Sequence, residues 1–128
     1  MKSEINPAVA VLNAVKCFSS GFTQMQDAMA QPAMRAVLNG AADLIYNMKG
    51  RLILSGVGKS GHVARKLAAT FSSTGTPAYF VHAAEASHGD LGMIQSDDVV
   101  MLLSWSGETG ELSDIIAYAA RFNVPVVA

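Results

Sequence analysis

The sequence predicts an α/β protein built on a doubly wound parallel sheet of the Rossmann-like or flavodoxin-like kind, with helices on both faces and further helices before it. Three observations predict this fold. Short apolar runs of strand length alternate with segments whose apolar residues recur every three or four positions. The connections are short, as expected for parallel strands joined by crossover helices. A glycine-rich turn directly follows the first apolar run.

The N-terminal third is predicted to be helical. The apolar spacing over residues 8–30 predicts one amphipathic helix, or two with a bend near Gly21. Pro32 suits the first turn of a further helix, which Lys49-Gly50 closes. No group of residues here suits catalysis. We therefore expect residues 1–48 to form a helical segment that packs on the following domain or contacts another subunit, with its methionines in the core.

Residues 49–128 are expected to form the sheet domain. The polar segment 82–94 is expected to be a loop after the second strand, and Asn123 suits a helix C-terminal cap. The predicted strands are Leu52–Leu54, Ala78–Val81, Val99–Leu103 and Val124–Ala128. The predicted helices begin near Ser60 and Gly110, and their inward residues are Val63, Ala64, Leu67, Ala68 and Phe71, then Leu112, Ile115, Ile116 and Ala119.

The last predicted strand ends the chain without a polar tail. Both faces of a parallel strand are normally covered. We therefore expect that the C-terminal part of the domain is missing from this chain, or that a partner subunit covers the strand.

Composition excludes several classes of function. The net charge of −1 gives no basic surface for nucleic acid. The single cysteine, Cys17, excludes an internal disulfide. No signal peptide and no apolar run of membrane-spanning length is recognisable, so we expect a cytoplasmic protein that binds no membrane.

The first polar turn, from Ser55 to Gly61, is predicted to bind phosphate. Its glycines let the backbone approach a ligand closely, the following helix directs its free N–H groups at the turn, and Lys59 adds a positive charge. The Walker A pattern fails, because Ile53 stands where it requires a glycine. Gly56, Gly58 and Gly61 have the spacing of a dinucleotide fingerprint, but the second strand ends in Phe80-Val81-His82 without the acidic residue that this interpretation needs.

The second polar turn, Ser104 to Thr109, follows the third strand. Hydroxyls at Ser104, Ser106 and Thr109 suit a phosphate dianion in a protein that is not basic, although helix capping alone would also explain serines here. Glu111 either complements the helix dipole or acts as a general base. The loop residues His82 and His88 match no closed zinc pattern, so we assign no metal site.

The segments GVGKSGHVARKLAATFSSTGTPAYFVHAAEASHGDLGMI and DDVVMLLSWSGETGEL closely resemble the sugar-isomerase (SIS) domain of arabinose-5-phosphate isomerases. The resemblance runs from about Lys49 to the last residue. It implies a cofactor-independent enzyme that interconverts D-ribulose 5-phosphate and D-arabinose 5-phosphate for the 3-deoxy-octulosonate sugar of lipopolysaccharide. It also implies a homo-oligomer, a dimer or a tetramer, whose active sites draw residues from neighbouring subunits.

The resemblance assigns roles to individual residues. Lys59 and Glu111 match an active-site lysine and glutamate, and His88 matches the histidine of the HGD segment. The family's second active-site glutamate, a later histidine, the last strand and the paired CBS domains of many members are absent here, and Trp105 replaces a small polar residue. The residues expected to bind the substrate phosphate are Ser55, Gly56, Gly58, Ser60, Ser104, Ser106 and Thr109.

The implied reaction moves a proton between C1 and C2 through an enediolate, with Lys59 stabilising the developing charge and Glu111 as an acid–base residue. We expect little activity from this chain alone. The main alternative is a non-catalytic phosphosugar sensor, as SIS domains in some transcription regulators are. No helix-turn-helix region precedes the domain, and the pairing of Lys59 with Glu111 favours an enzyme.

Overall fold

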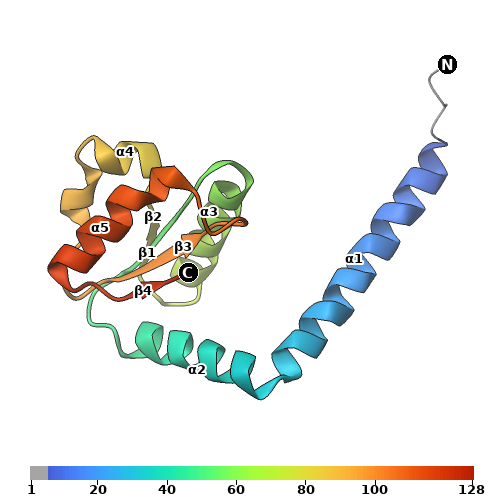
Figure 1. Ribbon diagram of the computed structural model, residues 1–128, viewed down its shortest axis with the longest axis horizontal. Coiled ribbons are helices and arrows are strands. Elements are labelled where there is room, and N and C mark those ends of the chain that lie inside the picture. The colour runs from blue at the N-terminus through green and yellow to red at the C-terminus, as the bar shows by residue number, and fades with distance from the viewer. Residues whose placement is uncertain (1–5) are drawn as a thin grey trace. The chain divides into compact units, whose positions relative to one another are not determined.

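A computed structural model describes residues 6–128. The chain divides into two compact units, and the boundary between them in the sequence lies between Gly40 and Ala41. The N-terminal helices are followed by strands alternating with helices (Figure 1). In chain order the elements are α1 (Pro7–Ala30), α2 (Pro32–Asn47), β1 (Leu52–Gly56), α3 (Gly58–Ser73), β2 (Ala78–Phe80), α4 (Ala83–Ser87), the 3₁₀ turn η1 (Asp90–Met93), β3 (Val99–Leu103), the 3₁₀ turn η2 (Gly110–Leu112), α5 (Ser113–Phe122) and β4 (Val126–Val127).

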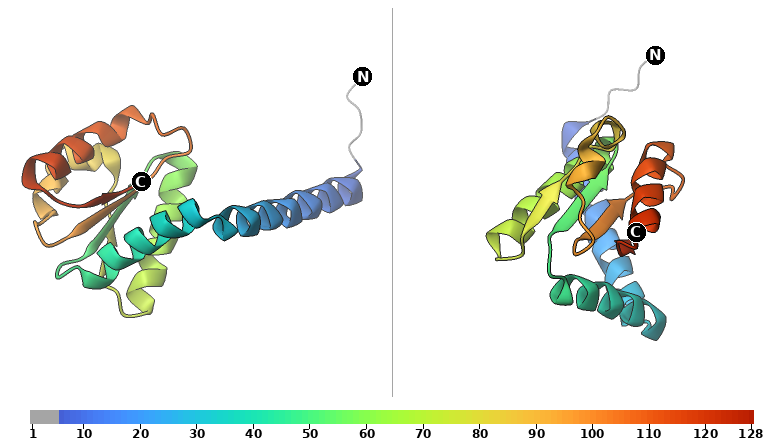
Figure 2. Two further views of the ribbon diagram at one scale, coloured as in Figure 1. Left: turned by 60° about the horizontal axis from the view of Figure 1, so that its bottom comes forward. Right: turned by 90° about the vertical axis from the view of Figure 1, so that its left-hand side faces the viewer.

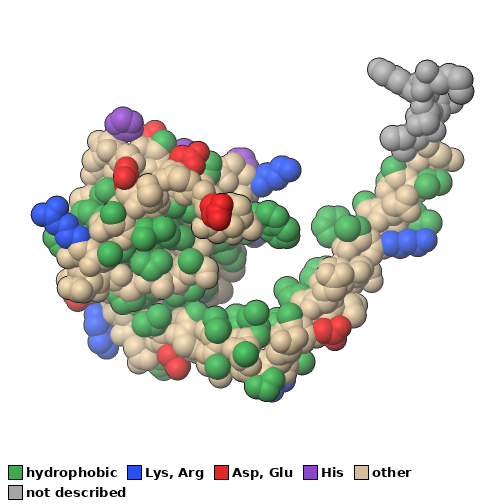
Figure 3. All heavy atoms as spheres, viewed as in Figure 1, with side chains coloured by type: hydrophobic (Ala, Val, Ile, Leu, Met, Phe, Trp, Pro, Cys, Tyr) green, Lys and Arg blue, Asp and Glu red, His purple; other side chains and the backbone are tan. Residues whose placement is uncertain are grey.

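The helix α1 is continuous, with no break at Gly21. Asn6 caps it by accepting a hydrogen bond from the Ala8 N–H at 3.0 Å, and Pro7 takes the first helical position. No residue of α1 is buried, and hydrophobic side chains lie exposed along it (Figure 3). The expectation that the methionines lie in the core is wrong for Met25, Met29 and Met34, which are exposed. The packing of residues 1–48 on the domain stays a prediction.

The sheet is parallel throughout and has the strand order β2-β1-β3-β4. Leu52 in β1 is in register with Ala78 in β2 on one side and with Val99 in β3 on the other. The chain therefore leaves β1 first to one side and then crosses to the other, which confirms the doubly wound fold.

Helices cover both faces of the sheet (Figure 2). On one face Ala64 and Ala68 of α3 pack on Leu52 and Leu54, together with residues at the end of α2. On the other face Ile115 and Ala119 of α5 pack on Ile53 and Val100, and α4 adds two alanines. The central strand β1 is buried along its whole length. The two polar turns that follow β1 and β3 are thus attached to well-buried strands.

Three expectations about this unit were wrong. Residues 82–94 are not a loop, since they form α4 and η1, and His82 caps α4 by accepting a hydrogen bond from the Ala84 N–H at 3.2 Å. Ile116 does not face inward, because the buried positions of this segment are 112, 115 and 119 and Ile116 is 49% exposed. Val63 is also exposed. The first helix of the domain begins at Gly58, slightly before the expected start near Ser60.

A buried ion pair joins the chain entering β1 to the chain entering β3. Asp98 is 1% exposed and accepts hydrogen bonds from the backbone N–H of Arg51 at 2.7 Å and from its Nη2 at 2.9 Å. The backbone N–H of Gln95 donates to the same carboxylate at 2.9 Å. Burial alone would raise the pKa of Asp98, but the hydrogen bonds from Arg51 and Gln95 outweigh it and hold that pKa below its usual range.

Candidate functional site

The candidate site lies at the carboxyl ends of β1 and β3. Gly56, the last residue of β1, is in register with Leu103, the last residue of β3. The turns that follow the two strands therefore start side by side. Because β2 lies on the other side of β1, this is also the point where the winding of the sheet reverses, which is where open α/β sheets bind ligands.

Glycines shape the turn after β1. A Cβ on Gly61 would lie 2.6 Å from the carbonyl oxygen of Gly56, so only a glycine lets α3 start this close to its strand. Gly58 has a φ of +57°, which a side chain would disfavour. The first turn of α3 thus lies directly over the end of β1.

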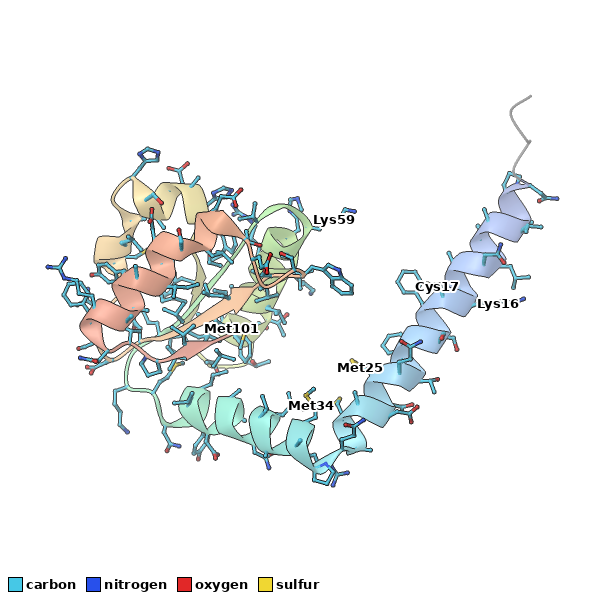
Figure 4. The ribbon with its side chains drawn as sticks, in the orientation of Figure 1. Lys16, Cys17, Met25, Met34, Lys59 and Met101 are labelled. Atoms are coloured by element: carbon cyan, nitrogen blue, oxygen red, sulfur yellow. The ribbon has the colours of Figure 1, made fainter. Side chains whose placement is uncertain are left out.

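The N-terminus of α3 provides unpaired N–H groups. Its N-cap residue is Val57, which has no side chain able to accept a hydrogen bond, so Ser60 does not cap this helix. Lys59 is exposed in the first helical turn and extends away from the helix end (Figure 4). The helix dipole and the lysine charge together favour an anion at this position.

Internal hydrogen bonds fix the turn after β3. The Ser104 and Thr109 hydroxyls lie 2.7 Å apart, and Ser104 Oγ also accepts from the Gly107 N–H at 3.0 Å. Ser106 Oγ accepts from the Glu108 N–H at 3.2 Å. The Thr109 side chain does not cap η2. These hydroxyls thus hold the turn in shape, and each also has a further donor or acceptor position for a ligand.

The two turns enclose a surface hollow of about 760 Å³, a size typical of small-molecule sites. Lys59, Ser60 and Ser104 give it a polar and cationic part. Its remaining lining is apolar: Val63, Leu102, Leu103 and Trp105. Sequence reasoning placed Val63 in the core, although Val63 follows Lys59 by four residues and so shares its face of the helix.

The other predicted site residues are not among those that line this hollow. Glu111 is exposed in η2, directly after the second turn. His88 is exposed at the C-terminal cap of α4, beyond β2. Ser55 is fully buried, and its hydroxyl has no hydrogen-bond partner among the described residues. Three of the predicted residues therefore line one hollow, while Ser55 reaches a ligand only if the turn opens.

The described part of the chain offers neither a metal centre nor a membrane span. Within residues 6–128 no three His, Cys, Asp or Glu side chains gather in a way that would hold a metal ion. In the same part of the chain no helix combines the length and the apolar character needed to cross a membrane.

Comparisons with known proteins place this geometry in a family. The SIS domain family matches residues 44–128. The arabinose 5-phosphate isomerase GutQ of Salmonella typhi is 59% identical over 88 residues, which are 69% of this chain and 27% of that protein. The arabinose 5-phosphate isomerase KdsD of Escherichia coli K12 is 49% identical over 87 residues, 68% of this chain and 26% of that protein. The chain thus spans about a quarter of the length of these curated relatives.

A solved structure resembles the chain over most of its length. It is an E. coli CFT073 protein in complex with arabinose 5-phosphate, with a TM-score of 0.81 and 36% identity over 95% of this chain and 64% of that one. Its similarity agrees with the family match over the sheet domain. From the parallel sheet, the paired polar turns and these matches, we conclude that the chain belongs to the SIS domain family.

Proposed function

We propose that this chain is the phosphosugar-binding part of an aldose–ketose isomerase that interconverts D-arabinose 5-phosphate and D-ribulose 5-phosphate. The observation that carries the proposal is the meeting of two polar turns, one with Lys59 and a helix N-terminus and one with three hydroxyls, at the reversal point of the sheet. The similarity to arabinose 5-phosphate isomerases supports the choice of substrate.

In this proposal the substrate phosphate lies between the two turns. Ser106 and one of the paired hydroxyls of Ser104 and Thr109 donate to its oxygens from one side, because the other hydroxyl of that pair uses its proton in their mutual hydrogen bond. The N–H groups of α3 and the Ser60 hydroxyl donate from the other side. Gly56 and Gly58 allow the close approach. Such a site binds a dianion without a basic surface, in keeping with a net charge of −1.

The sugar end of the ligand then extends toward the residues that move protons. One base removes the proton from C2 of the aldose, and the electrons form an enediolate with its negative charge on O1. Transfer of the O2 proton to O1 and reprotonation at C1 then give the ketose. We assign Lys59 to stabilising the negative oxygen, and Glu111 and His88 to acid–base steps. The chemistry needs no cofactor and no metal ion.

The wider setting is also part of the proposal. We infer a cytoplasmic enzyme in lipopolysaccharide 3-deoxy-octulosonate synthesis, assembled as a homo-oligomer whose subunits share sites. The activity is that of the whole protein, so the 128 residues alone are expected to turn over slowly. Strong turnover by a verified 128-residue protein would contradict this expectation.

Thermal melting tests the binding part. A ligand at a hundred times its Kd adds about 2.7 kcal/mol to the free energy of unfolding. We expect arabinose 5-phosphate to raise Tm by several degrees beyond the rise with inorganic phosphate. Ser106→Ala should reduce the rise, whereas Ser96→Ala, at the amino end of β3, should not. A rise with NADH alone would replace the proposal with a dinucleotide site.

Turnover separates an isomerase from a sensor, because a sensor binds the sugar phosphate without interconverting it. We expect slow formation of ribulose 5-phosphate that Glu111→Gln abolishes and that Glu108→Gln, three residues earlier and equally exposed, retains. Tight binding with no conversion after long incubation would favour the sensor.

A further inference from the structure

Trp105 is fully exposed, at 100% of its accessible surface, in a turn whose backbone is held in place. The side chains on either side of it, Ser104 and Ser106, are fixed by the hydrogen bonds described above. A tryptophan normally buries 150–250 Å² or so in a core or an interface. This ring does neither within residues 6–128, so it does not stabilise the described fold.

The ring borders the hollow between the two turns. Trp105 follows Leu103 by two residues, and Leu103 packs on the α3 face of the sheet, where Val63 also borders the hollow. Together with Lys59, Ser60 and Ser104 these side chains line the hollow. The lining therefore combines cationic and hydrogen-bonding groups with apolar ones.

A mixed lining of this kind fits an amphiphilic anion better than a simple one. Inorganic phosphate would use the polar groups only and leave the apolar side chains in water. A pentose phosphate carries a dianion at one end and C–H groups along its carbon skeleton, which can pack on the face of an aromatic ring.

We propose that Trp105 is a specificity residue, and that its indole ring packs against the carbon skeleton of a pentose phosphate whose phosphate lies between the N-terminus of α3 and the turn after β3. This inference rests on the proposed function and adds to it the means of telling a sugar phosphate from phosphate. Covering about a quarter of the side chain, roughly 50 Å², corresponds to about a five- to tenfold gain in affinity.

Fluorescence tests the contact directly, because Trp105 is the single tryptophan of the sequence. Its emission in the 128-residue chain reports on this ring alone. We expect saturating arabinose 5-phosphate to shift the emission to shorter wavelength and to protect the ring from acrylamide quenching. Inorganic phosphate at saturation should do neither. Protection that grows with protein concentration in the absence of ligand would show that a second copy covers the ring, and would overturn the proposal.

Calorimetry on variants separates this inference from the proposed function. We expect Trp105→Ala to keep the Tm of the wild type, to bind arabinose 5-phosphate about five- to tenfold more weakly and to bind inorganic phosphate unchanged. Trp105→Phe should recover part of the loss. Tyr46→Ala, which removes an 88% exposed aromatic ring from α2, is the matched control and should change neither affinity.

Two outcomes overturn the proposal in different ways. If wild type and Trp105→Ala bind arabinose 5-phosphate equally well and the emission does not respond, the ring is no part of the site, while the proposed function stands. If the wild type binds no sugar phosphate by calorimetry, both fail together.

Discussion

Replacing Asp98 with alanine should destabilise the sheet domain strongly, although Asp98 lies at the amino ends of the strands, away from the candidate site. The carboxylate is 1% exposed and is the shared acceptor for two backbone N–H groups and the Arg51 guanidinium. Arg51 precedes β1 and Asp98 precedes β3, so the pair holds together the two strands that carry the polar turns.

The expected magnitude follows from the groups that lose their acceptor. The N–H groups of Arg51 and Gln95 are part-buried, and each costs about 1 kcal/mol, at the low end of the usual range. The Arg51 side chain is 30% exposed and retains a hydrogen bond to the Met93 carbonyl, so losing its charged partner adds only about 1 kcal/mol. The sum is about 3 kcal/mol, or about 10–20 °C in Tm for a domain of this size.

Urea unfolding of the wild type and of Asp98→Ala at neutral pH measures this difference. Asp97→Ala is the matched control, because Asp97 is the adjacent, exposed aspartate. We expect the control to change the free energy of unfolding by less than about 0.5 kcal/mol. If Asp98→Ala were no more destabilising than Asp97→Ala, the hydrogen bonds of the carboxylate would not contribute as argued.

The pH dependence gives an independent check. The pKa of Asp98 is lowered in the folded protein, so its stabilisation is fully present above the unfolded pKa of about 3.9 and is lost as pH falls through the folded value. The gap in stability between the wild type and Asp98→Ala should therefore be constant near neutral pH and narrow on acidification below about pH 4. A gap independent of pH in that acidic range would exclude a role for the charge.

Three further changes test the turns. Gly61→Ala should cost about 1–3 kcal/mol in urea unfolding, because its Cβ would lie 2.6 Å from the Gly56 carbonyl oxygen; wild-type stability would mean that α3 moves easily. Ser55→Ala should leave the free energy of unfolding unchanged or raise it by up to about 1 kcal/mol, since it removes a buried hydroxyl without a partner among the described residues, and a clear loss would reveal a hidden hydrogen bond. Lys59→Met should weaken the binding of arabinose 5-phosphate, measured by calorimetry, about tenfold and reduce the salt dependence of that binding. Lys66→Met, on the same helix, should change neither. Equal losses of affinity in the two variants would indicate a nonspecific electrostatic effect of the whole helix.

The sequence was sufficient to predict the sheet because β1 and β3 are continuous apolar runs and their turns are rich in glycine and serine. Both runs are strands in the structure, in register from Leu52–Val99 to Gly56–Leu103. The αL conformation of Asn123, at a φ of 55°, also followed from local chemistry, because asparagine tolerates that geometry at a helix end.

Other features depend on contacts that a linear pattern does not contain. The five-residue helix α4 is too short to show a helical period, and its cap is a histidine rather than one of the usual capping residues. Ile115 and Ile116 are adjacent and equally apolar, so only the orientation of α5 against the sheet determines which of them is buried. The Arg51–Asp98 pair joins residues 47 positions apart and becomes visible only once the strands are in register.

In the candidate site, the positions of both turns could be predicted from the sequence, but the roles of their individual side chains could not. Ser104, Ser60 and Lys59 line one hollow, because β1 and β3 are neighbours in the sheet. The roles of Ser106, Thr109, Glu111 and His88 stay predictions. The buried state of Ser55 was not foreseeable, because a serine at a strand end is equally suited to facing the ligand or the core.

The adjacency of β1 and β3 also has a consequence for the order in which the protein folds. Each polar turn is local in sequence, but the two meet only after β1 and β3 pair in parallel, which is a slow, long-range step. A sugar phosphate held by both turns would have no complete site in a chain that has formed its helices but not this pairing. Such a ligand should therefore slow unfolding more than it speeds refolding, and its binding would report the moment at which the two central strands come together.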